Sequence, residues 1–183
     1  MSPNAFGIVA AVFYNGIEQI GKAIVAKLLN LRILANSTYS RSYSSMNTLF
    51  NDDFRAGHRR SMKGSAFIAP LNLNFAFECF QDFRDLIRQT PDAFMSLMVF
   101  EFFPFEKIIS VAQTDTSFAN RGAYGNILWI MGWTKAENDA GIRAWTRAMS
   151  EKAHEEFLLR KKQLKNNGVT EFGKLQDNEN LSP

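Results

Sequence analysis

The sequence is poor in the residues that build metal centres and disulfide frameworks. Its 183 residues include one cysteine, Cys79, and two histidines, His58 and His154. A single cysteine excludes an internal disulfide, and the two histidines lie too far apart in sequence to form a recognisable metal motif. We therefore expect no metal site.

Long apolar runs and an excess of one charge are also scarce. The run from Phe6 to Tyr14 is too short to cross a bilayer, and the first residues lack the positive charge of a secretion signal. The chain carries 21 Lys and Arg against 18 Asp and Glu, a net charge of +3, with both signs interspersed. We expect no membrane and no nucleic acid among its partners, and a location that is cytoplasmic or unknown.

Phenylalanine, in contrast, is abundant, with 17 Phe against 4 Tyr and 3 Trp. Hydrophobic residues make up 46% of the chain, enough to offset the entropy of folding, so intrinsic disorder is excluded as the main state. So many phenyl rings need a thick core, a large apolar pocket or a partner surface.

Hydrophobic periodicity predicts an α+β fold, with an antiparallel or mixed β-sheet and helices covering one face. Residues 1–168 are expected to form one domain and residues 169–183 a frayed tail. The predicted strands lie at 5–14, 33–41, 59–68, 94–103 and 124–134, and the predicted helices at 17–31, 42–50, 71–89 and from Lys135 to about residue 166.

Two of these strands, 94–103 and 124–134, are apolar on both sides, which is typical of strands covered on both faces. Trp129 and Trp133 share one strand face, where core packing is the simpler interpretation. If helices cover one face of the sheet, a ligand, a partner domain or a second subunit must cover the other.

Several sequence motifs occur in an order that identifies a family. Residues 99–109 read V-F-E-F-F-P-F-E-K-I-I, residues 115–126 read D-T-S-F-A-N-R-G-A-Y-G-N, and residues 142–147 read I-R-A-W-T-R. Upstream stand Y-N-G-I-E at 14–18, S-Y-S-S-M-N-T-L-F at 42–50 and G-H-R-R-S-M-K-G at 57–64. Over residues 5–172 the chain resembles the substrate-domain half of fungal FAD-linked oxidases of the berberine bridge enzyme-like group.

That resemblance implies a two-part flavoprotein. In the family, an N-terminal domain binds FAD, and a second α+β domain places a sheet over the flavin, with its exposed face lining the substrate cavity. The usual chemistry is two-electron oxidation of a small organic substrate, often in fungal secondary metabolism. This chain would supply the C-terminal half, without the preceding FAD-binding domain and without the closing helix. Its partners would be a small organic substrate and an FAD-domain chain or a homo-oligomer.

The resemblance also implies which residues face the substrate or the cofactor. Asn126 matches a family Asn on the strand facing the flavin, although a buried Asn is also commonly satisfied by backbone groups. Asn120 and Arg121 match the strand-entry loop, where Arg121 could pair with a carboxylate or phosphate, or hold the loop through carbonyl groups. Lys63 matches a Lys-Gly pair that either lines the cavity or is an exposed strand charge. Tyr124 is a candidate polar contact to the substrate.

Two carboxylates are candidates for acid–base chemistry, although the family's base varies and the catalytic group stays unknown. Glu101 lies in an apolar strand, where burial would raise its pKa, but it could instead point to a helix and pair with a Lys or Arg. Glu106 follows in the next loop and competes for the role. The alternative function is a non-catalytic protein that uses the former active-site face to bind a hydrophobic small molecule or partner.

Overall fold

The computed structural model describes residues 6–48, 51, 56–112, 114–118 and 121–167. The contacts within the chain group into two compact units, Met1–Ala56 and Gly57–Pro183. The sequence predicts a single domain over residues 1–168, and the tail predicted at 169–183 lies outside the described residues.

The first unit consists of short helices and irregular chain. It contains α1 (Glu18–Ile24), α2 (Ala26–Leu29) and the 3-10 helix η1 (Tyr43–Thr48). The helix predicted at 17–31 is confirmed as the two short helices α1 and α2. The helix predicted at 42–50 is a 3-10 helix over residues 43–48, and residues 49–50 lie outside the described residues. The strands predicted at 5–14 and 33–41 are wrong, because residues 6–15 and 33–41 form neither helix nor strand and pair with no described strand. Ile8 and Val9 are about 90% exposed, so this apolar run lacks the burial that would make it a strand.

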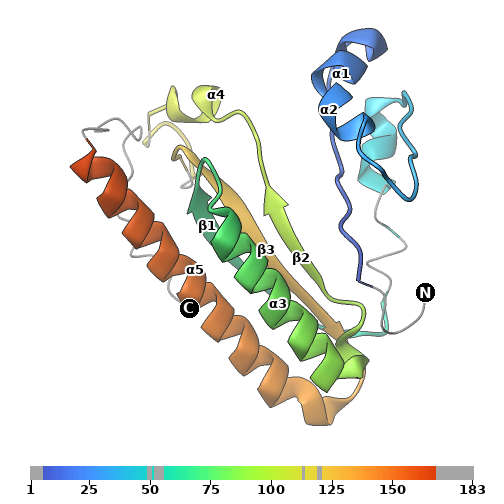
Figure 1. The fold of residues 1–183 in the computed structure, drawn as a ribbon, viewed down its shortest axis with the longest axis vertical. Helices are drawn as coiled ribbons and strands as arrows, with labels where there is room; N and C mark the ends of the chain where they lie inside the picture. The colour runs from blue at the N-terminus through green and yellow to red at the C-terminus, as the bar shows by residue number, and fades with distance from the viewer. Residues whose placement is uncertain (1–5, 49–50, 52–55, 113, 119–120, 168–183) are drawn as a thin grey trace. The chain divides into compact units, whose positions relative to one another are not determined.

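The second unit is an antiparallel three-stranded sheet backed by two long helices (Figure 1). The strands lie in the order β1 (Arg59–Ile68), β3 (Tyr124–Trp133), β2 (Leu97–Glu101), so β3 is central. Helices α3 (Leu73–Gln89) and α5 (Asp139–Asn166) lie side by side on one face (Figure 1). The remaining elements are η2 (Pro91–Ala93), α4 (Glu106–Ile109) and η3 (Ala136–Asn138). The α+β fold class and the helices on one face of an antiparallel sheet are therefore confirmed.

The core lies between the sheet and the two helices. Residues of β3 at alternate positions, Ile127, Trp129, Met131 and Trp133, are fully buried on this side. The Trp129 ring meets Trp145 of α5 edge to face, with 5.9 Å between ring centroids. The predicted core role of Trp129 and Trp133 is confirmed.

The buried stripe of α3 matches only in part the stripe that the sequence predicts, which consists of Leu73, Phe77, Phe80, Phe83 and Ile87. The helix buries Phe75, Cys79 and Ile87, so Ile87 is correctly predicted. Phe80 and Phe83 are half-buried, whereas Leu73 and Phe77 are exposed. Either stripe has helical spacing, and the sheet beneath the helix decides which one is buried. The helix begins where the Asn72 side chain accepts hydrogen bonds from the backbone of residues 74 and 75.

Strand β2 is shorter than the predicted strand 94–103. The strand begins at Leu97 because side-chain hydrogen bonds replace backbone pairing at the preceding residue, Ser96. The Ser96 hydroxyl accepts a hydrogen bond from the Gly132 N–H at 3.1 Å and lies 3.4 Å from the Gly132 carbonyl oxygen.

Among the helices in the described part of the chain, none is long and apolar enough to cross a membrane.

Candidate functional site

The face of the sheet opposite α3 and α5 is the candidate site, and we call it the open face. Where all three strands pair, the register places nine residues on it: Met62, Gly64 and Ala66 of β1, Leu97, Val99 and Glu101 of β2, and Asn126, Leu128 and Ile130 of β3. Met62 is 68% exposed and Leu97 is 44% exposed, so apolar side chains on this face are not packed into the core. An apolar surface of this kind is typical of an interaction or ligand site.

Glu101 and Asn126 are the polar pair of this face. They are directly opposite each other in the register of β2 and β3, and the Asn126 Nδ2 donates a hydrogen bond to Glu101 Oε2 at 3.0 Å. Both side chains are half-buried, and the other seven residues of the open face are apolar or glycine. The pair thus offers one carboxylate and one amide from a surface that is otherwise without hydrogen-bonding side chains.

This arrangement decides between the alternatives that the sequence leaves open for these two residues. Asn126 is bonded by a side chain, not by backbone groups. Glu101 points away from the helices, and its side-chain partner in the structure is an amide, not a Lys or Arg. A carboxylate oriented by an amide can accept a hydrogen bond or a proton from a hydroxyl or amine placed against the face.

Arg121 has a loop-holding role in this structure. Its guanidinium donates to the Ile108 carbonyl at 3.5 Å and to the Thr116 hydroxyl, and it lies over the Phe118 ring at 5.5 Å. These contacts tie the segment before β3 to α4. They match the second of the two interpretations offered by the sequence, in which Arg121 fixes the strand-entry loop.

The other predicted site residues do not gather at the open face. Lys63 pairs with Trp129 in the register and therefore lies on the helix-covered side of β1. Tyr124 is buried, with its ring edge to face with Phe157 of α5 at 6.1 Å. Glu106 is exposed at the first position of α4, and Asn120 lies outside the described residues.

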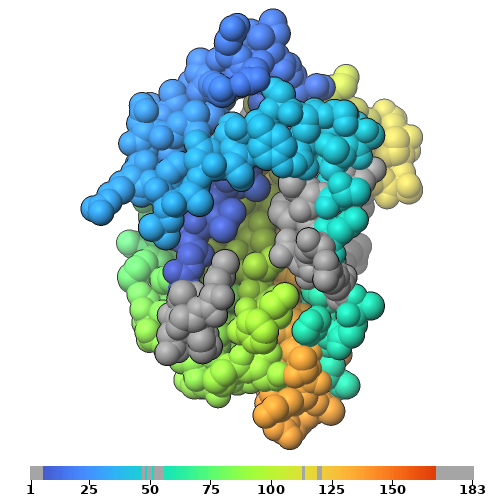
Figure 2. Space-filling model, turned by 90° about the vertical axis from the view of Figure 1, so that its right-hand side faces the viewer, coloured from blue at the N-terminus to red at the C-terminus, as the bar shows by residue number. Residues whose placement is uncertain are grey.

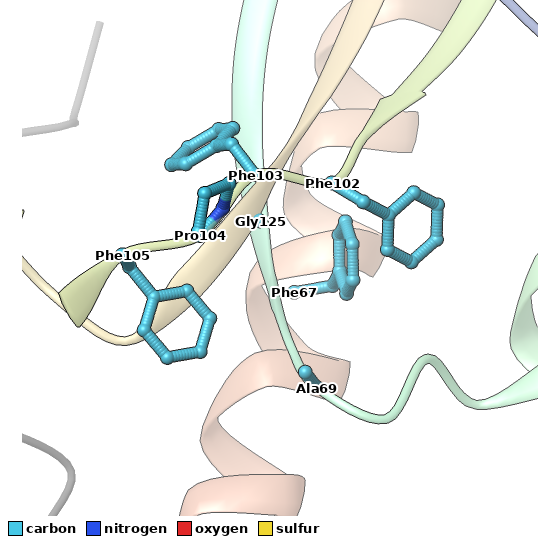
Figure 3. A pocket seen from close by; sticks show the side chains of 7 residues that line it. All are labelled: Phe67, Ala69, Phe102, Phe103, Pro104, Phe105 and Gly125. Atoms are coloured by element: carbon cyan, nitrogen blue, oxygen red, sulfur yellow. The ribbon is translucent and has the colours of Figure 1, made fainter. Parts of the chain in front are cut away.

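A second feature, a hollow of about 370 Å³, lies just beyond the ends of β1 and β2 (Figure 3). Its lining is almost wholly aromatic or small: Phe67, Ala69, Phe102, Phe103, Pro104, Phe105 and Gly125. These residues were not predicted to form a site from the sequence. The signal that could have found it is the pattern F-F-P-F at residues 102–105, where a proline ends the strand and leaves the following rings without strand neighbours.

At the end of the sheet away from the hollow, Asp92 holds the turn between β3 and α5. Its carboxylate accepts hydrogen bonds from the Thr134 hydroxyl and backbone N–H, from the Lys135 N–H and from the Asn138 side chain. The bond from the Thr134 hydroxyl, followed by that from Lys135, holds the pKa of Asp92 well below its usual range. In Figure 2 the orange surface of the β3–α5 turn lies directly beside the light green surface of the segment that includes η2.

Asp139 joins three elements at the same end. It accepts from Arg59 of β1 and, at 2.7 Å, from the Trp133 indole N–H of β3, while it begins α5. The Arg59 guanidinium lowers the pKa of Asp139 below its usual value. These carboxylates are structural, because each is already saturated by donors from its own unit.

Within the described residues, no three His, Cys, Asp or Glu side chains gather as a metal site would require.

Comparison with known proteins identifies no family for this chain. No family model, no curated protein and no solved structure matches the chain.

Proposed function

We propose that this chain is the substrate-domain half of an FAD-linked oxidoreductase similar to the berberine bridge enzyme-like oxidases. In this proposal an FAD-binding domain on another polypeptide docks against the open face. The complex oxidises a small organic substrate, in a fungal secondary-metabolite pathway. The observation that carries the proposal is the Glu101–Asn126 pair on an otherwise apolar sheet face.

The described residues suit the ring system of a flavin. Its isoalloxazine is planar, with apolar faces and a polar edge, and the open face offers Val99, Leu128 and Ile130 beside the Glu101–Asn126 pair. When bound, a flavin would supply the acceptor for the two electrons leaving the substrate. The nine residues of the open face include no cation, and Arg60, on the same side of β1, lies six residues along the strand from Ala66, the β1 neighbour of the pair. The nine residues therefore do not suit the FAD diphosphate. The diphosphate is therefore assigned to the FAD-binding domain.

The proposal gives each residue of the pair a task on this chain. Asn126 holds Glu101 in one orientation through its Nδ2, and its amide oxygen can accept from a donor on the ring edge or on the substrate. Glu101 accepts the proton that a substrate hydroxyl or amine loses as it is oxidised. The apolar side chains around the pair exclude water from the site.

The experiment is reconstitution with an FAD-binding domain of the same family, expressed as a separate chain. The complex is purified through a tag on this chain, and its visible absorbance is recorded. We expect the flavin band in the wild-type complex and its loss or displacement with Asn126→Leu. Lys63→Met, on the helix-covered side of β1, is the matched control and should leave the band unchanged. A wild-type preparation that never carries the flavin band would refute the proposal.

The exposed apolar residues of the open face support a second candidate, a non-catalytic protein that binds a hydrophobic molecule or partner there. Met62 and Leu97 are solvent-exposed without any flavin domain present. This candidate predicts that Leu128→Asp abolishes ligand or partner binding while Glu101→Gln has no effect. In the oxidoreductase, Glu101→Gln would slow substrate oxidation by roughly 10²–10⁴-fold if the carboxylate is the base.

A further inference from the structure

One wall of the hollow beyond β1 and β2 is aromatic and joins the core through Phe67. Phe67 is almost fully buried and belongs to the core cluster with Phe75 and Cys79. Its ring meets the Phe102 ring edge to face at 5.0 Å and the Phe100 ring at 6.0 Å. Phe67 therefore anchors this side of the hollow in the core, while Phe102, which is 66% exposed, forms its outer edge.

Gly125 leaves room for the Phe67 ring in this wall. A Cβ built on Gly125 would lie 2.3 Å from the Phe67 ring and 2.7 Å from the Glu101 carbonyl oxygen. Only a residue without a side chain permits the phenyl ring to lie so close to the central strand. On the far side, Pro104 holds the backbone between Phe103 and Phe105, whose rings project from that segment (Figure 3).

The chemistry of the lining selects the class of ligand. None of the seven lining residues carries a charge or a polar side chain, so a charged ligand would lose its hydration without compensation. Phenyl rings favour another aromatic ring, offset or edge to face. A cavity of about 150 Å³ holds benzene. A hollow of about 370 Å³ therefore has room for about two fused rings.

We propose that this hollow binds a neutral, planar aromatic compound of about two fused rings. The site is separate from the Glu101–Asn126 pair, whose side chains lie on the open face, and binding here needs no flavin. The inference thus goes beyond the proposed oxidoreductase function, and its test does not depend on that function.

The test is titration of the full chain, without any flavin domain, with the neutral two-ring probe prodan (6-propionyl-2-dimethylaminonaphthalene), followed by the rise in probe fluorescence. We expect saturable binding at one site per chain. Ala69→Phe places a ring in the hollow at an exposed lining position and should weaken binding by about tenfold or more. Phe77→Ala removes an exposed phenyl ring on α3, outside the hollow, and should leave the dissociation constant unchanged.

A second variant keeps the test decisive if Ala69→Phe fails to fold. Phe105→Asp introduces a charge into the lining outside the core cluster and should also weaken probe binding. Circular dichroism checks that each variant retains its helix content. If folded Ala69→Phe and Phe105→Asp both bind the probe as the wild type does, the hollow is not the site and the proposal is wrong. Non-saturable binding by the wild type would overturn it equally.

Discussion

Cys79 shows how burial decides the chemistry of a single side chain. It is fully buried in α3, and this burial raises the pKa of its thiol to about 12. Since the thiolate is the nucleophile, we expect Cys79 to react with iodoacetamide at pH 8 roughly 10³-fold more slowly than an exposed cysteine. Mass spectrometry of the alkylated chain measures this, with the urea-unfolded chain as the fast control. Rapid alkylation of the folded chain would contradict the buried position.

Gly125 carries a residue-scale prediction about packing. Gly125→Ala places a Cβ against the Phe67 ring and the Glu101 carbonyl, so we expect a loss of about 1–3 kcal/mol in the free energy of unfolding. Gly64→Ala is the matched control on β1, because a Cβ there meets nothing within 4 Å. It should be neutral or stabilise by up to about 1 kcal/mol. Urea unfolding compares the two, and equal effects would show that Gly125 is not tightly enclosed.

The turn between β3 and α5 depends on one carboxylate from another element. Asp92 stabilises the folded chain while it is ionised, and its pKa is lowered by folding. That stabilisation is complete above the ordinary Asp pKa of about 3.9 and is lost as the pH falls below it. Asp92→Asn should therefore lower the melting temperature at pH 7, with the difference from wild type shrinking below about pH 4.

Thermal unfolding from pH 3 to pH 7 measures this difference. Asp85→Asn is a suitable control, since Asp85 is an exposed carboxylate that makes only long ion pairs with Arg84 and Arg88 on its own helix. A wild-type advantage over Asp92→Asn that persists unchanged at pH 3 would contradict the role of the charged carboxylate.

Elements with strong local patterns were predictable, and elements that depend on distant partners were not. The strand at 59–68 has the predicted bounds, and the helices at 71–89 and beyond 135 are found within a few residues. The apolar run at 5–14 was misassigned because apolarity alone does not provide a neighbouring strand. The strand predicted from residue 94 begins at 97, since the sequence does not reveal that Ser96 bonds to Gly132.

The candidate site was likewise only partly predictable from the sequence. Glu101 and Asn126 stand out in sequence as polar residues in apolar strands, but their pairing depends on the register of β2 and β3, which spacing alone does not determine. Lys63 was proposed as facing the substrate, and the register places it on the helix side. The aromatic hollow combines residues from three separate segments, so no local pattern contains it.

At the scale of the whole molecule, the exposed apolar surface predicts self-association. Met62 on the open face is 68% exposed, and other large apolar side chains are exposed in each unit. Met62→Lys should increase the monomer fraction of the isolated chain, because a charge on this face opposes its burial. Leu73→Lys, at an exposed position on α3, is the control and should change it little. Light scattering across a concentration series measures both, and a wild-type chain that stays monomeric at high concentration would contradict the prediction.

The central claim is that the open face receives an FAD-binding domain. The most direct measurement is sedimentation velocity of this chain mixed with such a domain, recorded at the visible flavin absorbance band. The account predicts that the flavin signal sediments at the combined mass of the two chains, and that Leu128→Asp on the open face returns it to the mass of the FAD-binding domain alone. A flavin signal that stays at the mass of the FAD-binding domain at every concentration of the wild-type chain would contradict the account.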